Sequence, residues 1–202
     1  MKAGDAMMRK MTVMSVVAVL VLMLWSCGGL RYSQVSPDAT NFHPRSIGIL
    51  SVDVGSYGEA RGIVDQIFAG VLAKKGWFET VVSSETIKSQ MMNNPETRQA
   101  VVDYVTKLKA VNFSDPDLSK KIGVLYQMDA FLLVTIDFWN YTMEAEDKVA
   151  KVGFAVRLVE AQTGKTMWEA GHHEAKKYVL FKPDLSDLAE DVAKTMINEM
   201  PH

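Results

Sequence analysis

Ala130-Phe131-Leu132-Leu133-Val134-Thr135-Ile136-Asp137-Phe138-Trp139-Asn140-Tyr141 is the most strand-like stretch of this 202-residue chain. In a strand, successive side chains point to opposite faces. One face would be apolar, with Ala130, Leu132, Val134, Ile136 and Phe138. The other face would become more polar and aromatic towards its end, with Phe131, Leu133, Thr135, Asp137, Trp139 and Tyr141. The pattern predicts a core strand.

The residues after this stretch predict two more strands and a helix. Residues 148–160 alternate again, with five inward positions: Ala150, Val152, Phe154, Val156 and Leu158. A turn at 161–164 leads into a strand at 165–170, and short joins between sequential strands predict an antiparallel meander. From Asp184, apolar residues at helical spacing predict a C-terminal helix.

The residues before this stretch predict a β-α-β unit. A short apolar strand at 47–53 is followed by a helix from about Gly58 to Lys75, which Gly76 ends, and by a strand at 78–82. Such a crossover joins parallel strands. Residues 84–127 predict two or three helices. The fold class is therefore α/β: a mixed sheet with an opening β-α-β unit, a helical middle, a three-stranded antiparallel meander and a C-terminal helix, in a single domain over residues 45–202.

Four segments of this domain carry a family resemblance. They are Pro44-Arg45-Ser46-Ile47-Gly48-Ile49-Leu50, Gly76-Trp77-Phe78, Met128-Asp129-Ala130-Phe131-Leu132, and residues 157–169 with their Thr163-Gly164-Lys165-Thr166-Met167-Trp168 turn. Together they resemble small envelope lipoproteins whose domain is similar to the amino-terminal domain of TolB and the globular part of CsgG. The resemblance implies an assembly and contact role in the bacterial envelope, commonly as an accessory to transport or secretion, with no catalytic residues.

The first 28 residues predict export and lipidation. Basic residues precede an apolar run from Thr12 to Trp25, which is shorter than the roughly 20 residues of a membrane span and is typical of a signal peptide. The run closes on Leu24, Trp25, Ser26, Cys27 and Gly28, which resemble the lipobox of bacterial lipoproteins. That resemblance implies cleavage after residue 26 and acylation of Cys27. Trp25 departs from the pattern, because a small residue is normal there. The alternative is an uncleaved signal anchor with an incidental cysteine.

Lipidation also accounts for the single cysteine, which has no partner for an internal disulfide. Stable membrane attachment needs more than one acyl chain, and the lipoproteins that this segment resembles carry three. Gly28 in place of aspartate favours the outer membrane over the inner one by resemblance to enteric sorting rules, with the domain facing the periplasm. Residues 27–44 are rich in turn formers and predict a tether between lipid and domain.

The charge balance gives no sign of a nucleic-acid partner. The chain has 22 basic and 24 acidic residues, and without residues 1–26 its net charge would be −4. Nucleic-acid-binding domains are basic. The partners that we expect are membrane lipid through Cys27, an envelope protein, and a second copy of the chain.

Three motifs invite a binding or catalytic interpretation. The loop Asp53–Gly58, with Asp53, Ser56 and Tyr57, follows a first strand, where open α/β sheets place ligands, but it lacks a phosphate-binding or nucleophile-elbow pattern. Gly164-Lys165-Thr166 joins two strands, so a tight hairpin turn explains it better than a nucleotide site. Adjacent His172 and His173 would point to opposite faces of a strand, so we expect an exposed strand end and no metal.

Two functions remain. The first is a non-enzymatic lipid-anchored interaction module without a cofactor, whose aromatic residues Trp139, Tyr141 and Trp168 face a partner. The alternative is a ligand-binding or hydrolytic lipoprotein that uses the loop Asp53–Gly58. A pocket with convergent polar groups at that loop would favour the alternative.

Overall fold

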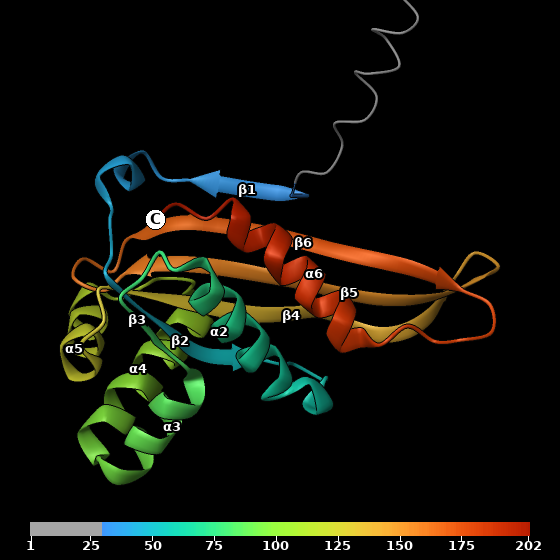
Figure 1. The fold of residues 1–202 in the computed structure, drawn as a ribbon. Coiled ribbons are helices and arrows are strands. Elements are labelled where there is room, and N and C mark those ends of the chain that lie inside the picture. The colour runs from blue at the N-terminus through green and yellow to red at the C-terminus, as the bar shows by residue number, and fades with distance from the viewer. Residues whose placement is uncertain (1–29) are drawn as a thin grey trace, which may run out of the picture.

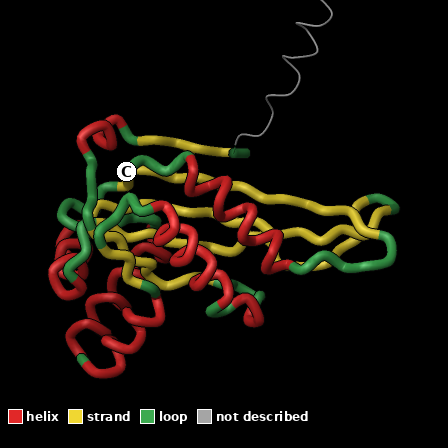
Figure 2. Tube along the Cα trace, viewed as in Figure 1, coloured by secondary structure: helices red, strands yellow, loops and turns green. Residues whose placement is uncertain are grey.

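The computed structural model describes residues 30–202. One mixed sheet carries helices on both faces (Figure 1 and Figure 2). Its six strands lie in the order β1-β6-β5-β4-β2-β3. The strands are β1 (Tyr32–Val35), β2 (Ser46–Asp53), β3 (Thr80–Val82), β4 (Ala130–Glu144), β5 (Asp147–Glu160) and β6 (Thr166–Tyr178). β2 is parallel to β3 and β4, whereas β4, β5 and β6 are antiparallel neighbours. The predicted α/β fold class is confirmed.

The helices begin and end where the local sequence requires. They are α2 (Ile63–Lys75), α3 (Ser84–Asn93), α4 (Pro95–Val111), α5 (Pro116–Tyr126) and α6 (Leu185–Asn198), with short 3-10 helices η1 (Pro37–Asn41) and η2 (Gly58–Ala60). Side-chain oxygens of Ser83, Asn94, Asp115 and Asp184 cap α3, α4, α5 and α6. Gly76 ends α2 at φ 65°, a conformation that glycine adopts without strain. The middle of the chain is helical, as predicted.

The helices cover the two faces of the sheet unequally. We call the face beneath α2 and α6 the covered face. Its core runs from Phe68 on α2 and Met196 on α6 to Trp139 far along β4. The other face packs against α3, α4 and α5 around Leu50, Phe131 and Val159. These three helices gather at one end of the molecule, on the left in Figure 1, and the long strands β4–β6 continue past them to the right. We call the second face the open face.

A β-bulge changes the alternation of β4 in the middle of the strand. Ile136 pairs with Phe154, but Phe138 pairs with Gly153, so Asp137 has no partner of its own on β5. The side chains after the bulge are therefore shifted by one face. Trp139 joins Ile136 on the covered face and Phe138 lies on the open face, the reverse of the prediction.

The fold begins earlier than predicted. Residues 27–44 were expected to be a tether, but β1 pairs antiparallel with β6, from Tyr32 opposite Gly171 to Val35 opposite Trp168. The indole N–H of Trp168 donates to the Ser33 hydroxyl at 3.0 Å, and Phe42 is buried. The boundary at residue 45 is therefore wrong, because the free edge of β6 takes up residues 32–35 as a further strand.

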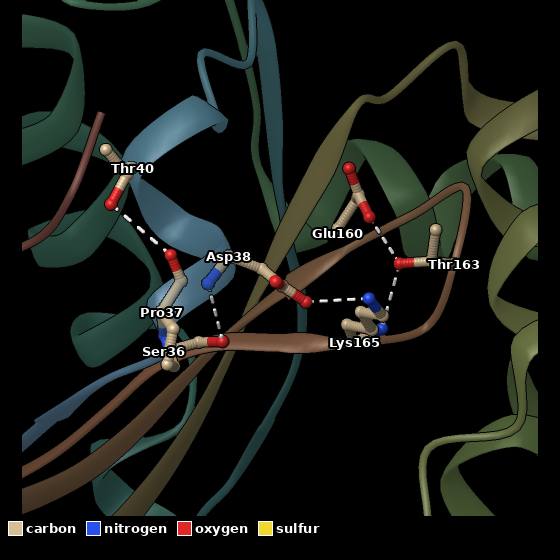
Figure 3. A network of polar contacts seen from close by, with 7 residues as sticks. All are labelled: Ser36, Pro37, Asp38, Thr40, Glu160, Thr163 and Lys165. Atoms are coloured by element: carbon tan, nitrogen blue, oxygen red, sulfur yellow. Dashed lines mark hydrogen bonds and ion pairs between the residues drawn. The ribbon is translucent and has the colours of Figure 1, made fainter.

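The Thr163-Gly164 segment is a hairpin turn, as predicted. Figure 3 shows its contacts: the Thr163 hydroxyl donates to the Glu160 carboxylate, and the Lys165 ammonium donates to Asp38 of η1 at 2.6 Å. Gly164 has φ 68°, and a Cβ there would lie 3.0 Å from Cα of Pro116. The glycine is therefore needed for the turn and for the approach of α5, and the turn joins β5 to β6 without forming a phosphate site.

Candidate functional site

A groove of about 510 Å³ opens on the open face of the sheet, between α4 and β6. Its floor and walls are made by the last turns of α4, the middle of β4–β6 and the rim residue Tyr32. Its lining includes Tyr32, Asp53, Val105, Leu108, Lys109, Asn112, Leu133, Ala155, Arg157, Glu169 and Gly171. Among the described helices, α4 is the one that contributes residues to the lining of the groove.

The middle of the groove is apolar and shallow. Val105 and Leu108 follow Tyr104 on α4, where the helix passes from the core onto the floor of the groove, and both are half-buried. Ala155 and Gly171 keep the floor low. A surface of this composition suits an apolar or amphipathic segment of a partner.

Charged residues at the two ends of the groove are already paired. At one end, Lys109 Nζ lies 2.7 Å from Asp53 Oδ2, and this contact lowers the pKa of Asp53. At the other end, Arg157 donates from Nε to Glu169 at 2.8 Å and from Nη2 to Asn112 at 3.0 Å. Opposite charges at contact distance stabilise each other's ionised forms. The groove can therefore align a partner by hydrogen bonds, and its Asp53 carboxylate is held as an anion.

An aromatic cluster continues the open face towards the far end of the strands. Phe138 and His173 meet edge to face, with ring centroids 5.2 Å apart, over the backbone of Gly153. Lys151 Nζ lies 4.3 Å from the centre of the Phe138 ring. Burial lowers the pKa of His173, and the nearby charges of Arg31 and Lys151 act in the same direction. His173 is therefore neutral near pH 7.

His172 lies on the covered face, opposite its neighbour. Its Nδ1 is buried without a hydrogen-bond partner, and burial lowers its pKa although Glu174 lies 4.0 Å away. The prediction that the two rings point apart is confirmed, but their expected place at an exposed strand end is wrong, because β6 continues to Tyr178. In residues 30–202, no group of three or more His, Cys, Asp or Glu side chains is placed to hold a metal ion.

Two of the three predicted partner-facing aromatics are core residues. Trp168 is completely buried and Trp139 is 4% exposed. The bulge at Asp137 turns Trp139 inward, and β1 closes over the edge beside Trp168. Tyr141 is 39% exposed, but its hydroxyl donates to the Pro183 carbonyl at 2.7 Å, so it supports the loop between β6 and α6. The predicted aromatic strip does not exist as a surface.

The predicted ligand loop does not converge either. Asp53 lies at the groove, but Tyr57 packs against the core of the covered face and its hydroxyl donates to the Asp137 carbonyl at 3.4 Å. Ser56 is exposed and is not part of the groove lining. The three residues therefore form no common pocket, because the chain turns at Gly55, with φ 51°, towards the opposite face.

Asp129, another acidic residue at a strand end, has a structural role. Its carboxylate accepts hydrogen bonds from the backbone N–H of Arg45 and Ser46 and from the Ser46 hydroxyl, at 2.9 to 3.1 Å. It thereby joins β2 to the start of β4. The hollow beside it, of about 660 Å³, is lined by residues of the segment 41–45, of α5, and of the segments 127–129 and 160–162.

The loop between β6 and α6 was missed by sequence reasoning. Val179, Leu180 and Phe181 are 85%, 84% and 87% exposed, more than any other large apolar side chain in the described part of the chain. The signal in the sequence is an apolar triplet between Lys177 and Lys182 that is too short for a further strand. An exposed triplet of this kind is a candidate contact site.

The lipobox residues Leu24, Trp25, Ser26, Cys27 and Gly28 lie outside the described residues. Within residues 30–202, no helix is both long and apolar enough to span a bilayer. The lipidation of Cys27 stays a prediction.

Together these features define a single α/β domain with an open sheet face. No protein-family model and no curated protein sequence matches the chain. The fold is similar to that of the PelC dodecamer from Paraburkholderia phytofirmans, with a TM-score of 0.54 and 12% identity over 82% of this chain and 92% of that chain. A variant of PelC in a second crystal form gives a TM-score of 0.51, with 14% identity over 82% of this chain and 93% of that chain.

A third solved structure, the lipoprotein GNA1162 from Neisseria meningitidis, has a TM-score of 0.47 and 15% identity, over 77% of this chain and all of that chain. At identities this low, the two PelC matches show a shared fold alone. The resemblance to TolB and CsgG stays a prediction.

Proposed function

We propose that this protein is a lipid-anchored envelope protein whose domain works by contact with other protein chains, its own copies first among them. Acylated Cys27 holds it to the outer membrane, and the domain faces the periplasm. Support for the anchor comes from the sequence: a basic start, an apolar run and a lipobox-like close on a single cysteine.

The observation that carries the contact role is the groove on the open face. Its middle is apolar, its charged residues are paired, and the strands that form its floor are rigid parts of the sheet. Binding sites that are held on rigid elements need little ordering when a partner arrives. The groove therefore offers a preformed surface with two polar ends that set the direction of a bound segment.

A second copy is the partner that we favour. The fold is shared with PelC, which is a dodecamer in its solved structures. Tyr32, on the rim of the groove, belongs to the edge strand β1 and is 48% exposed, so the groove and a sheet edge adjoin. An exposed edge strand is a template for pairing with another chain. An oligomer built on this side would cover both.

The test is native mass spectrometry of the full chain, purified from membranes in detergent. The wild type should give a defined oligomer. Leu108→Glu, which puts a charge on the groove wall, should shift the population to monomer. Val102→Glu is the matched control, because Val102 lies on the same helix, is 46% exposed and does not line the groove. A monomeric wild type, or equal loss in both variants, would contradict the proposal.

The anchor is tested separately. The mass of the mature protein should show residues 1–26 removed and three acyl chains on Cys27, and Cys27→Ala should leave an unmodified chain. A mature wild type with a free thiol would reject the anchor but not the oligomer.

The size of the groove favours one other candidate, a small ligand. Ligand sites have volumes of roughly 300–1,000 Å³, and the groove lies in this range. In this case the native mass spectrum would show a monomer with a bound small molecule, which Leu108→Glu would remove and Val102→Glu would retain.

A further inference from the structure

The loop between β6 and α6 presents its apolar side chains in a fixed way. The rings of Tyr141 and Tyr178 meet edge to face at its base, with centroids 5.9 Å apart, and Tyr141 also bonds the Pro183 carbonyl. Lys182 Nζ lies 4.7 Å from the centre of the Tyr141 ring. Both ends of the loop are therefore attached to β4, and only residues 179–181 project. Met143, at the end of β4, adds a further apolar side chain, 57% exposed.

This loop lies at the end of the molecule towards which β1 points when the strand is followed back to its first residue. In Figure 1 the loop is at the right, beside the β4–β5 turn. The arrow of β1 points to the left, so this strand begins at the right-hand end of the arrow. Tyr32 is opposite Gly171 in the antiparallel β1–β6 pair, so β1, followed back to its first residue, points in the direction in which β6 runs towards Tyr178.

The reach of the chain matches this geometry. From Gly171 to Tyr178 is seven residues of β6, about 24 Å at roughly 3.4 Å per residue. From Tyr32 back to Cys27 is five residues, which span at most about 17 Å. With the strands upright and this segment fully extended, a cysteine held at a bilayer surface would leave the loop at least about 7 Å deeper than itself. Interfacial elements bury their apolar side roughly 5–10 Å into the headgroup and acyl boundary.

The charges around the loop favour insertion driven by apolar contact. Lys176, Lys177 and Lys182 flank it, but Asp147 pairs with Lys177, and Glu146 and Asp184 lie close in sequence to the two turns. The charges balance, so attraction to anionic headgroups adds little. Long lysine side chains at such a place reach back to the headgroups while their stems stay in apolar surroundings.

We propose that Val179, Leu180 and Phe181 insert into the same bilayer leaflet that holds the acyl chains of Cys27, and so form a second membrane contact. The inference rests on the proposed anchor, and it sets the orientation of the domain: β4–β6 stand on the membrane, and α3–α5 lie furthest from it. A membrane is favoured over a protein partner because the apolar triplet lies where the anchor must bring lipid.

The test places an environment-sensitive dye on the loop of the full chain. Leu180→Cys is labelled with a thiol-reactive nitrobenzoxadiazole dye, and the protein is reconstituted into vesicles of phosphatidylethanolamine and phosphatidylglycerol that carry nitroxide-labelled lipid. Met92→Cys is the matched control, since Met92 is 75% exposed on α3. We expect a blue shift and strong quenching at position 180, no change at position 92, and reduced quenching when Val179→Ser and Phe181→Ser are added. High salt should not reverse the quenching.

The outcomes separate the loop from the anchor. Labelling of two thiols per chain would show that Cys27 is free and would reject the anchor. The same measurement in a Cys27→Ala background, which carries the dye at position 180 alone, would still decide the loop. Emission at position 180 equal to that at position 92 would overturn the inference. A blue shift without quenching by lipid would place the loop in a protein contact, a second copy included, and would overturn it too.

Discussion

The covered and open faces of the sheet are formed by the same strands, but burial extends further along the covered face. On the covered face, side chains stay buried further along the strands, from Leu132 to Trp139 on β4. On the open face, burial stops near Phe131, and half-exposed residues such as Arg157 and Phe138 follow. The reason lies in the connections. α6 follows β6 and returns along the covered face, whereas β4, β5 and β6 are joined by tight turns that supply no helix to the open face (Figure 1).

The open face is the part of the sheet that is accessible to other molecules. An antiparallel meander leaves one of its faces to water unless another element covers it. Here α3–α5 cover one end of that face, and the groove and the Phe138 cluster stay uncovered. The four predictions below test this difference, in order of expected effect.

The largest effect is expected on the covered face, at Trp168. Trp168→Ala should lower the free energy of unfolding by about 3–5 kcal/mol, because it leaves a cavity under β1 and removes the bond to Ser33. Phe138→Ala on the open face should cost clearly less, since Phe138 is half-buried. Urea denaturation of both variants measures the difference, and equal losses would mean that the two faces are equally packed.

The next largest effect is expected at Gly153 of β5, which lies beside Phe138 and His173 on the open face. A Cβ there would lie 2.6 Å from Cβ of His173 and 2.8 Å from Phe138, so Gly153→Ala should destabilise the fold by about 1–3 kcal/mol. The control is Gly70→Ala on α2, which meets no atom within 4 Å and should stabilise the helix by up to about 1 kcal/mol. Thermal unfolding gives the sign for each, and a neutral Gly153→Ala would show that the aromatic cluster is loose.

A smaller effect is expected from pH, with one histidine on each face. Burial lowers the pKa of His172 and of His173 below 6.5, so the unfolded chain binds protons more readily than the folded one. Stability is then full above about pH 7 and falls as the pH drops through 6.5 towards the folded-state pKa. Glu174 and Glu199 oppose the shift at His172, and Glu144 opposes it at His173.

The measurement is the free energy of unfolding between pH 7 and 5 for the wild type, His172→Gln and His173→Gln. Loss of His172 should flatten the profile more, because its Nδ1 is buried without a partner. An unchanged profile in both variants would assign the pH dependence to other groups.

The smallest effect is expected at the Asp53–Lys109 pair on the rim of the groove. Both side chains are largely exposed, at 39% and 59%, and exposed pairs contribute less than about 1 kcal/mol. Lys109→Met should therefore change stability little, but it should raise the pKa of Asp53 towards its ordinary value. An NMR titration of the Asp53 carboxyl measures this, and Lys74→Met, which breaks the exposed pair with Glu190, is the control.

Much of the fold could be predicted because the pattern of burial is local. The alternation at 148–160 predicted the inward residues of β5, all of which are in the core of the covered face. The glycine at 76 marked the end of α2 correctly. The β-α-β unit followed from two apolar runs that flank a helical period.

The errors occur where burial is decided by distant residues. The bulge at Asp137 depends on pairing with β5, so Trp139 was assigned to the wrong face. β1 is exposed along its length and shows no pattern, since only the edge of β6 gives it a partner. The second half of β6 is polar on the open face, because there it continues past α3–α5.

The candidate site was less predictable than the fold. Asp53 was correctly placed at the carboxyl end of β2, but its neighbours in the groove come from α4, β5 and β6. Because these residues are far apart in the sequence, no sequence pattern indicates that they lie together. The exposed triplet at 179–181 contradicts the expectation that apolar runs are buried.

The attachment of β1 has a mechanical consequence. Tyr32 to Val35 run antiparallel to β6, so a force that pulls on the chain ahead of Tyr32, along the strand axis, acts in shear. The backbone bonds of this pair and the link from Trp168 to Ser33 then bear the load together, whereas a pull across the strands would break them in succession. Tension from a membrane-held start of the chain would thus be transmitted through β1 to β6 without separating the two strands.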